Sequence, residues 1–512
     1  MRSLARHDGS VIDDPDRCYR ALQSRDSRFD GWFFVAVTST HIYCRPSCAA
    51  ITPKRANVRF YPTAAAAQTA GFRACKRCRP DATPGSPEWN ARHDLVGRAM
   101  RLISDGVVDR DGVSGLANRL GYSERHLTRQ LTDAVGAGPL ALARAQRAQT
   151  ARILVETTDL PFTNVAFAAG FSSIRQFNDT IRDVFATTPS ALRATSHKRV
   201  GASDDSATRS PGTLALRLPY RPPFDASSLF TFLGARAVPG VEDWDGTTYR
   251  RALRLPNGAA TVALTPADGH IACTLRLDHL GDLAAAVARC RRLLDLDADP
   301  VAVTAVLGND ELLAPLVAAA PGRRAPGAVD GSELAVRAVL GQQVSVAGAR
   351  THAARLVADC GERLAAPDGA LTSLFPSPEA IATLDPAKLA MPDSRKRALR
   401  GLCTALASGA LTIDPGADRS ALESNLLALP GIGPWTVAYI ELRALGDPDA
   451  FMPSDLGVRR ALEHLGVAGD PVSATRLAER WRPWRSYALA HLWASLSWIS
   501  SSLIHPRTRR RP

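Results

Sequence analysis

Alternating hydrophobic and polar residues mark one part of the chain. The alternation covers residues 249–255, 260–265 and 271–277, and short turn-forming segments rich in Pro, Gly, Asn and Asp join these runs. A period of two between such turns predicts antiparallel strands in a meander. From residue 333 onward the apolar positions follow a helical period instead, with loops rich in proline and glycine. We therefore expect an α+β lobe over 213–325 and an all-α lobe over 326–505.

Two helical segments in the middle of the chain repeat one another. LANRLGYSERHLTRQL at 116–131 and VAFAAGFSSIRQFNDTI at 165–181 share one apolar register. Gly121 and Gly170 stand where a sharp turn between two helices needs a positive φ, and the serines after them can cap the next helix. Each unit therefore predicts a helix-turn-helix, and a helical bundle without a DNA role is the alternative for 93–195. Three apolar residues of the second unit are expected in its core: Phe177, Ile181 and Phe185.

Two polar segments rich in glycine, proline and serine separate the predicted units. They lie at 83–87 and 196–212 and show no hydrophobic period. A chain of 512 residues is too long for a single core, so several domains are expected. Because both segments have the composition of flexible linkers, we expect the domains to act independently. The predicted domains are 1–83, 93–195, 213–325 and 326–505.

The charge balance favours a polyanionic partner. The formal net charge is +13 and the isoelectric point is near 9.7, although a basic balance alone fits DNA, RNA or a membrane surface. The N-terminus has no apolar core of a signal peptide, and the apolar run 487–504 is interrupted by His491 and serines. We therefore expect a cytoplasmic protein, in which nine cysteines point to free thiols or metal ligands.

Four of those cysteines form two short knuckles. Cys44 and Cys48 are separated by three residues, and Cys75 and Cys78 by two, with 26 residues between the pairs. Such spacings let two sulfurs of one turn meet two of another around a tetrahedral Zn²⁺. The pattern predicts one zinc ion, and four reduced structural cysteines are the alternative.

A glycine turn in the helical lobe predicts a clamp for a nucleic-acid backbone. The sequence LPGIG at 429–433 lies between two helical runs, and Gly431 and Gly433 lack the Cβ atoms that would keep a phosphate away from the backbone N–H groups. After a loop rich in Pro, Gly and Asp, Asp455 precedes the next apolar helix. A clamp with a positioned carboxylate suggests chemistry on bound DNA, whereas an ordinary helix N-cap is the alternative for Asp455.

Here the chain resembles the helix-hairpin-helix DNA glycosylases. The turn followed by Pro-x-Asp, GQQVSVAGA at 341–349 and WRPWRSYALAHLW at 481–493 are similar to 3-methyladenine DNA glycosylase II of the AlkA type. The resemblance implies hydrolysis of the N-glycosidic bond of alkylated purines, with Asp455 as the catalytic carboxylate. It implies an aromatic base pocket, for which core packing is the alternative, formed by Trp435, Tyr439 and Trp493. It also implies DNA contacts through Gly431, Gly433, Thr436, Gln342 and Gln343, the two glutamines lying where a side chain enters the gap left by the flipped base.

Two features exclude other branches of that family. Trp435 occupies the position at which lyase members carry a Schiff-base lysine, so the product should be an intact strand with an abasic site. No cysteine follows Cys403, so the family's four-cysteine iron–sulfur loop is missing from the sequence. The basic run 507–511 is expected to be a solvated tail that adds non-specific DNA affinity.

The cysteine segment resembles the N-terminal domain of Ada-type methylation sensors. The resemblance rests on FFVAVTSTHIYCRPSC at 33–48 and AGFRACKRCRPD at 70–81. It implies that Cys44 accepts a methyl group from a DNA phosphotriester in a single turnover, and a purely structural zinc knuckle is the alternative. The family usually carries a basic residue soon after the second cysteine, whereas Lys54 is the first one here.

The middle segment resembles the tandem helix-turn-helix domain of AraC-type regulators. The repeat and the closing sequence FATTPSALR carry this resemblance. It implies two recognition helices that begin near Ser123 and Ser172 and face DNA. The residues expected to contact bases or phosphates are Ser123, Arg125, His126, Arg129, Ser173, Arg175 and Gln176.

Together these resemblances predict a multidomain α+β protein with a zinc-bound domain, a tandem helix-turn-helix domain and a two-lobed glycosylase. Its expected partners are methylated and promoter double-stranded DNA and RNA polymerase, and its expected location is the nucleoid. One rival is a regulator whose glycosylase-like half only binds or scans DNA. Another is a constitutive glycosylase whose first two domains are DNA tethers. The Pro-Cys-His-Arg motif of O6-alkylguanine methyltransferases is absent from the sequence, so that repair is not expected.

Overall fold

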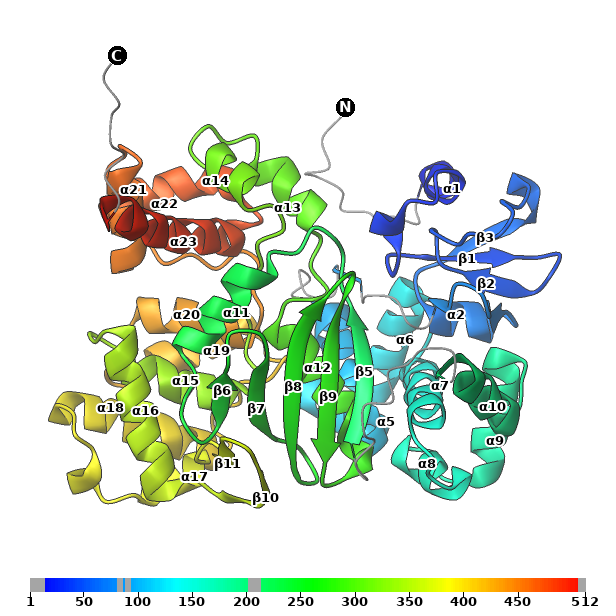
Figure 1. Cartoon of the computed structure of the whole chain (residues 1–512), viewed down its shortest axis with the longest axis horizontal. Coiled ribbons are helices and arrows are strands. Elements are labelled where there is room, and N and C mark those ends of the chain that lie inside the picture. The colour runs from blue at the N-terminus through cyan, green and yellow to red at the C-terminus, as the bar shows by residue number, and fades with distance from the viewer. Residues whose placement is uncertain (1–13, 81–85, 88–93, 201–212, 505–512) are drawn as a thin grey trace.

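A computed structural model describes residues 14–80, 86–87, 94–200 and 213–504 (Figure 1). The chain forms four successive units: a small domain that carries the cysteine pairs, a helical middle domain, a sheet-centred lobe and a helical lobe. This arrangement confirms the expected multidomain α+β class. The basic run 507–511 and most of the linker 196–212 lie outside the described residues. No helix among the described residues is long and apolar enough to cross a membrane.

The first domain is a four-stranded sheet with two short helices. The strand order is β3-β1-β2-β4, in which β2 and β4 are parallel and the other pairs antiparallel. The two cysteine knuckles follow the ends of β2 and β4, so this parallel pair brings them together. The elements are α1 (Pro15–Gln23), β1 (Phe34–Val37), β2 (Ile42–Cys44), β3 (Val58–Tyr61), α2 (Ala64–Thr69) and β4 (Arg73–Ala74).

The middle domain contains helices only and forms two helix-turn-helix units. Gly121 and Gly170 both have positive φ at the predicted turns. The second-unit residues Phe177, Ile181 and Phe185 are buried, as predicted. The helices are α4 (Leu95–Ser104), α5 (Val107–Leu120), α6 (Glu124–Val135), α7 (Pro139–Thr157), α8 (Phe162–Ala168), α9 (Ile174–Phe185) and α10 (Pro189–Val200). Because α10 continues to Val200, the helix extends into the segment that was expected to be a linker from residue 196.

The third unit is a five-stranded antiparallel sheet with the order β5-β9-β8-β7-β6. Its three central strands are the predicted meander, which is thereby confirmed, and two edge strands extend it. The elements are β5 (Thr213–Pro219), α11 (Ala226–Ala235), β6 (Glu242–Trp244), β7 (Tyr249–Arg254), β8 (Ala259–Ala267), β9 (His270–Leu277), α12 (Leu283–Leu293), α13 (Pro300–Leu307) and α14 (Ala314–Ala319).

The last lobe is helical with one small hairpin. Its helices are α15 (Gly331–Leu340), α16 (Val346–Cys360), α17 (Pro378–Thr383), α18 (Asp393–Ala407), α19 (Arg419–Leu427), α20 (Pro434–Ala444), α21 (Leu456–His464), α22 (Pro471–Ala478) and α23 (Arg485–Ile504). The hairpin, β10 (Arg363–Asp368) and β11 (Leu371–Ser373), was not predicted. It forms because Gly369 takes a positive φ and Leu364 and Leu371 pack with Ala252 of the neighbouring sheet.

The middle domain and the helical lobe contact one another through side chains of α4, whereas independent action of the domains stays a prediction. Leu102 of α4 packs over Gly416 in the helical lobe, where a Cβ atom would lie 2.4 Å from the leucine. Arg98 of α4 donates to the Gly416 carbonyl at 2.7 Å and pairs with Asp418 at 3.2 Å. Linker composition reports how freely a segment moves but not whether the surfaces at its two ends fit, so the sequence did not predict this docking.

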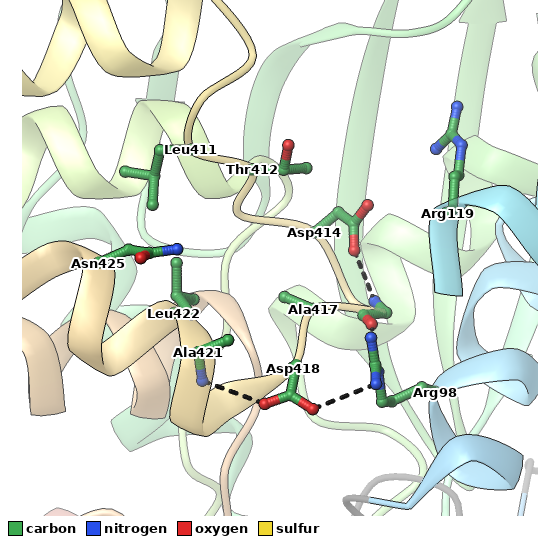
Figure 2. Close-up of a pocket in the computed structure, with 11 residues that line it drawn as sticks. Arg98, Arg119, Leu411, Thr412, Asp414, Ala417, Asp418, Ala421, Leu422 and Asn425 are labelled. Atoms are coloured by element: carbon green, nitrogen blue, oxygen red, sulfur yellow. Dashed lines mark hydrogen bonds and ion pairs between the residues drawn. The ribbon is translucent and has the colours of Figure 1, made fainter. Parts of the chain in front are cut away.

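A cavity of about 470 Å³ lies along this interface. Arg98 and Arg119 of the middle domain line one side, and α19 with its preceding loop lines the other (Figure 2). The cavity contains none of the expected glycosylase residues, so it is separate from the candidate active site.

Candidate active site and metal centre

The glycine turn has the backbone geometry of a helix hairpin. Gly431 has φ of +84°, and a Cβ there would lie 2.7 Å from the Cβ of Ala398, so conformation and packing both require glycine. Gly433 caps α20, and a Cβ added to it would meet nothing within 4 Å. Packing therefore does not explain Gly433, whereas an unobstructed backbone at a helix N-terminus suits contact with a phosphate.

The two glutamines expected at the DNA gap differ in their surroundings. Gln342 donates to the Gly431 carbonyl and to the Thr436 hydroxyl, both at 3.0 Å, and Thr436 is buried. Gln342 thus links Gly431 to Thr436 across the turn, and the direct DNA contacts of Gln342 and Thr436 stay predictions. Gln343 is exposed and has φ of +57°, in the left-handed region that favours glycine. That backbone projects Gln343 to the surface beside the turn.

Asp455 is both an N-cap and the centre of a cluster of aromatic residues. Its Oδ1 accepts from the backbone N–H of Val458 at 3.0 Å, which caps α21. The indole of Trp493 donates to Oδ1 at 3.0 Å, and the indole of Trp435 donates to Oδ2 at 2.9 Å. Three N–H donors therefore fix the orientation of the carboxylate. The N-cap alternative is therefore compatible with the catalytic one.

Four aromatic rings form a cluster, in which the two indoles contact the carboxylate and the other two rings stack on the indoles. On α20, Trp435 and Tyr439 are stacked with centroids 5.3 Å apart and planes inclined by 8°. Phe232 of α11 lies against Trp493 of α23, at 6.4 Å and 17°. Trp435 and Trp493 therefore contact Asp455 directly, and Tyr439 joins the cluster by stacking on Trp435. Phe232 was missed because it lies 203 residues before Trp435 in an apolar helix that has no distinguishing motif.

Two arginines adjoin these rings. Arg443 Nη1 donates to the Tyr439 hydroxyl at 2.7 Å, and its guanidinium carbon lies 5.0 Å from the Phe232 centroid. The guanidinium carbon of Arg236 lies 3.7 Å from the same centroid. Burial raises the pKa of Tyr439, but Arg443, Arg236 and Arg337 outweigh burial and hold that pKa below its usual value. No motif in the sequence indicates Arg443 or Arg236.

A glycine next to Asp455 leaves room for the cluster. A Cβ on Gly457 would lie 3.0 Å from Asp455 Oδ1 and 3.1 Å from Trp493 Cδ1. Real Cβ atoms rarely approach so closely, so a larger residue would displace the carboxylate or the indole. Gly457 is therefore part of the site, although its sequence context does not indicate it.

The four predicted cysteines form one cluster in the first domain. Their sulfur atoms all lie within 4.8 Å of one another, and all four residues are buried. Sulfurs bound tetrahedrally to zinc at about 2.3 Å are about 3.8 Å apart, so a zinc ion fits this cluster with little movement. The loop between Cys44 and Cys48 is ordered by the buried Asp30, which accepts from the Ser47 backbone and hydroxyl and pairs with Arg45 at 3.4 Å.

The predicted recognition helices have exposed outer faces. Ser123 caps α6 and Ser173 caps α9, each by accepting a backbone N–H of its own helix. Ser172, at which the second helix was expected to begin, lies one residue before that cap. The remaining predicted contact residues are exposed or half-buried on these faces, namely Arg125, His126, Arg129, Arg175 and Gln176.

The fold and these sites define a class of protein: a helix-hairpin-helix base-excision enzyme joined to a cysteine-zinc domain and a helix-turn-helix domain. Four family models match the chain, and they follow one another from the N-terminus to the C-terminus. They are the metal binding domain of Ada over 17–81, a helix-turn-helix domain over 116–195, the AlkA N-terminal domain over 215–330 and the HhH-GPD superfamily base excision DNA repair protein over 336–486. The Ada model and the cysteine cluster together support one zinc ion.

Curated relatives match the whole chain or parts of it. A Mycobacterium tuberculosis (strain H37Rv) protein named probable bifunctional transcriptional activator/DNA repair enzyme AlkA is 59% identical over 94% of this chain and 97% of its own length. Escherichia coli DNA-3-methyladenine glycosylase 2 is 37% identical over 55% of this chain and 97% of its own length. The Escherichia coli bifunctional transcriptional activator/DNA repair enzyme Ada is 33% identical over 32% of this chain and 46% of its own length.

The chain belongs to the family of bifunctional transcriptional activator/DNA repair enzymes of the AlkA type. It is a DNA-binding protein whose C-terminal half is a DNA glycosylase.

Proposed function

We propose that the glycosylase half hydrolyses the N-glycosidic bond of alkylated purines of the 3-methyladenine type and leaves an abasic site. The arrangement of Asp455 between the indoles of Trp435 and Trp493 supports this most directly. A scanning module needs the glycine turn alone, whereas an oriented carboxylate among aromatic rings suits base excision. We assign the sheet lobe to 213–325 and the helical lobe to 326–505.

The proposed reaction begins with extrusion of the damaged base from the duplex. Gly431 and Gly433 hold the strand, and Gln343 is the residue best placed to enter the gap. The flipped base stacks on the aromatic cluster, and Asp455 stabilises positive charge on the deoxyribose as the glycosidic bond breaks. The electron pair of that bond stays on the cationic alkylated base, which leaves as a neutral molecule. Water then adds to C1′ and releases a proton to solvent.

The direct test is release of free 3-methyladenine from methylated duplex DNA by the intact protein. We expect released base together with alkali-labile sites in the DNA, without strand cleavage before alkali. Absence of both products would overturn the enzyme proposal and favour a regulator whose C-terminal half only binds or scans DNA.

We also propose that the first domain accepts a methyl group from a DNA methylphosphotriester on Cys44. Zinc would keep its ligand thiols deprotonated and nucleophilic. The Cys44 sulfur attacks the methyl carbon, the carbon–oxygen bond breaks, and its electron pair stays on the phosphate oxygen. The cysteine becomes a neutral thioether, so the zinc site loses one negative charge and repels DNA less. Cys48, Cys75 and Cys78 are the remaining ligands in this proposal.

The test uses DNA containing methylphosphotriesters and mass measurement of the Cys44 peptide. We expect an added methyl group there and none on Cys18, a buried cysteine outside the cluster. Cys44→Ala should abolish the transfer, while Cys18→Ala should retain it. Labelling that persists in Cys44→Ala would contradict the assignment.

The middle domain, for which we propose 93–195, would place α6 and α9 in the major groove of promoter DNA. The proposed contacts are Ser123, Arg125, His126, Arg129, Ser173, Arg175 and Gln176. RNA polymerase is the proposed partner at the promoter, and nucleoid association follows from DNA binding. Arg175→Ala should weaken promoter binding in a gel-shift assay. Equal binding by the variant would remove α9 from the proposed interface.

A further inference from the structure

Two arginine side chains place positive charge against the aromatic cluster. The Arg443 guanidinium carbon lies 5.0 Å from the Phe232 centroid and 5.5 Å from the Tyr439 centroid, and that of Arg236 lies 3.7 Å from the Phe232 centroid. Phe232 and Tyr439 in turn stack on Trp493 and Trp435, the two residues that hold Asp455. The guanidiniums are therefore one ring away from the indoles.

Neither guanidinium has a counter-ion in the part of the chain that the structure describes. Over residues 14–80, 86–87, 94–200 and 213–504, no carboxylate forms an ion pair with Arg443 or Arg236. Arg443 is buried, donates to the Tyr439 hydroxyl and the Gly327 carbonyl, and leaves its Nε without a partner. A buried cation without a carboxylate partner is costly, which makes Arg443 a candidate for a functional role.

The neighbouring Arg337 and Arg251 form ion pairs, unlike Arg443 and Arg236 in the described part of the chain. Arg337 pairs with Glu242 and Glu333 at 3.0 and 2.9 Å, and Arg251 pairs with the same two carboxylates. The fold thus supplies carboxylates to the arginines under the sheet but not to the two beside the rings. Burial lowers the pKa of Arg236 to about 10, so this guanidinium still carries its charge at neutral pH.

We propose that Arg443 and Arg236 stabilise the negative charge that develops on the departing base, and so favour excision of neutral damaged bases. This inference rests on the glycosylase function proposed above. Asp455 forms the negative end of the site, near the sugar, and the two guanidiniums form the positive end, near the base. When the C1′–N bond breaks, its electron pair moves from the sugar to the base, and both ends of this arrangement stabilise that shift.

The effect depends on the charge of the base before the reaction. A neutral base such as hypoxanthine leaves as an anion and takes a proton from water, so it gains most from the guanidiniums. A cationic base such as 7-methylguanine leaves as a neutral molecule, and the same charges repel it while it is bound. Arg443 and Arg236 are therefore specificity-determining residues that set the ratio of neutral to cationic bases released.

The experiment compares single-turnover release from two duplexes, one with a single hypoxanthine and one with a single 7-methylguanine. Arg443→Met and Arg236→Met keep much of each side chain's volume and remove its charge. We expect each to lower the hypoxanthine rate by about tenfold while the 7-methylguanine rate falls much less or rises. Arg443→Lys restores a charge and should recover part of the hypoxanthine rate.

Arg217→Met serves as the matched control, because Arg217 lies on the exposed face of β5 in the sheet lobe. It should leave the ratio of the two rates unchanged. A merely structural role of Arg443 would lower both rates together, so a loss of the 7-methylguanine rate as large as that of the hypoxanthine rate in both Arg443→Met and Arg236→Met would overturn the inference. If Arg443→Met fails to fold, the half-buried Arg236 carries the test alone.

The outcomes separate this inference from the function on which it rests. If the native chain releases neither base, nor 3-methyladenine, the glycosylase proposal itself fails. If the native chain releases 3-methyladenine and the variants leave the hypoxanthine to 7-methylguanine ratio unchanged, only the assignment of the two arginines fails.

Discussion

Replacing Asp455 by asparagine removes the charge of the carboxylate while keeping its shape. The amide oxygen can retain the two bonds now made to Oδ1, from the Val458 backbone and the Trp493 indole. The amide NH₂ then takes the place of Oδ2 and faces the Trp435 indole N–H, which is also a donor. In the native chain the indole nitrogen lies 2.9 Å from Oδ2. Two donors repel each other at that distance, so Trp435 or the amide must shift.

The expected loss of rate follows from the lost attraction between the carboxylate and the sugar. Opposite unit charges about 4–5 Å apart at an effective dielectric constant of about 20 attract by about 3–4 kcal/mol. That free energy corresponds to a fall of about two to three orders of magnitude in the rate of bond cleavage. The lost charged hydrogen bond costs about 1.5–3 kcal/mol of stability at most, which a domain stable by about 5–15 kcal/mol survives.

The assay is single-turnover release of 3-methyladenine by the native chain and by Asp455→Asn, with DNA binding measured by fluorescence anisotropy. Asp470→Asn is the control, because Asp470 also caps a helix, α22, but has no aromatic partner among its hydrogen bonds. We expect release to collapse only in Asp455→Asn, with binding retained in both. A folded Asp455→Asn protein that keeps its rate within about tenfold of the native chain would refute the electrostatic role of this carboxylate.

Three further changes test other parts of the structure. Gly457→Val should reduce base release by about tenfold without loss of DNA binding, because its Cβ crowds Trp493; release assays and anisotropy check this. Gly416→Ile should separate the middle domain from the helical lobe, because it collides with Leu102, and small-angle scattering should show a larger radius of gyration. Burial raises the pKa of the Asp295 carboxyl from 3.8 to about 7. The stability that this carboxyl contributes is therefore fully present below pH 3.8, its unfolded pKa, and is lost as the pH rises through about 7. Asp295→Asn should therefore raise Tm more at pH 8 than at pH 5 in thermal melts.

Each of these has a control or a contrary outcome. Gly401→Ile suits Gly416→Ile, because a Cβ on Gly401 of α18 meets nothing within 4 Å. An unchanged radius of gyration in Gly416→Ile would show that the docking does not depend on this contact. Normal base release by Gly457→Val would mean that the cluster around Asp455 tolerates displacement. A Tm difference that is constant with pH would remove Asp295 as the titrating group.

Patterns that are local in the chain were predictable from the sequence. The four cysteines lie in two knuckles of three and two intervening residues, so their spacing alone indicated a zinc site. The strands of the meander follow from alternation and turn residues, because one face of each strand packs against the core while the other faces solvent. The glycine turn and both helix-turn-helix units were likewise predictable, because positive φ and helix capping are properties of a few consecutive residues.

Resemblance to known families added residues that no local pattern indicates. Trp435, Tyr439 and Trp493 are ordinary aromatic residues in helices, and only the family motif marked them as pocket residues. The structure brings Trp435 and Trp493 to Asp455 from 20 and 38 positions away in the chain, and Tyr439 stacks on Trp435. The different contacts of Gln342 and Gln343 were not predictable, because the sequence of a turn does not show which of two adjacent side chains points inward.

The tertiary structure alone decided the rest. Phe232 and Arg236 belong to the sheet lobe, and they reach the aromatic cluster only because α11 packs against the helical lobe. The lack of an ion pair to Arg443, within the part of the chain that the structure describes, is likewise a property of the packed lobes. The docking of Leu102 on Gly416 joins residues more than 300 positions apart. Contacts between distant segments depend on the fit of whole surfaces, so the sequence determined the parts of this protein and their chemistry, while packing determined the charge and shape of the site between them.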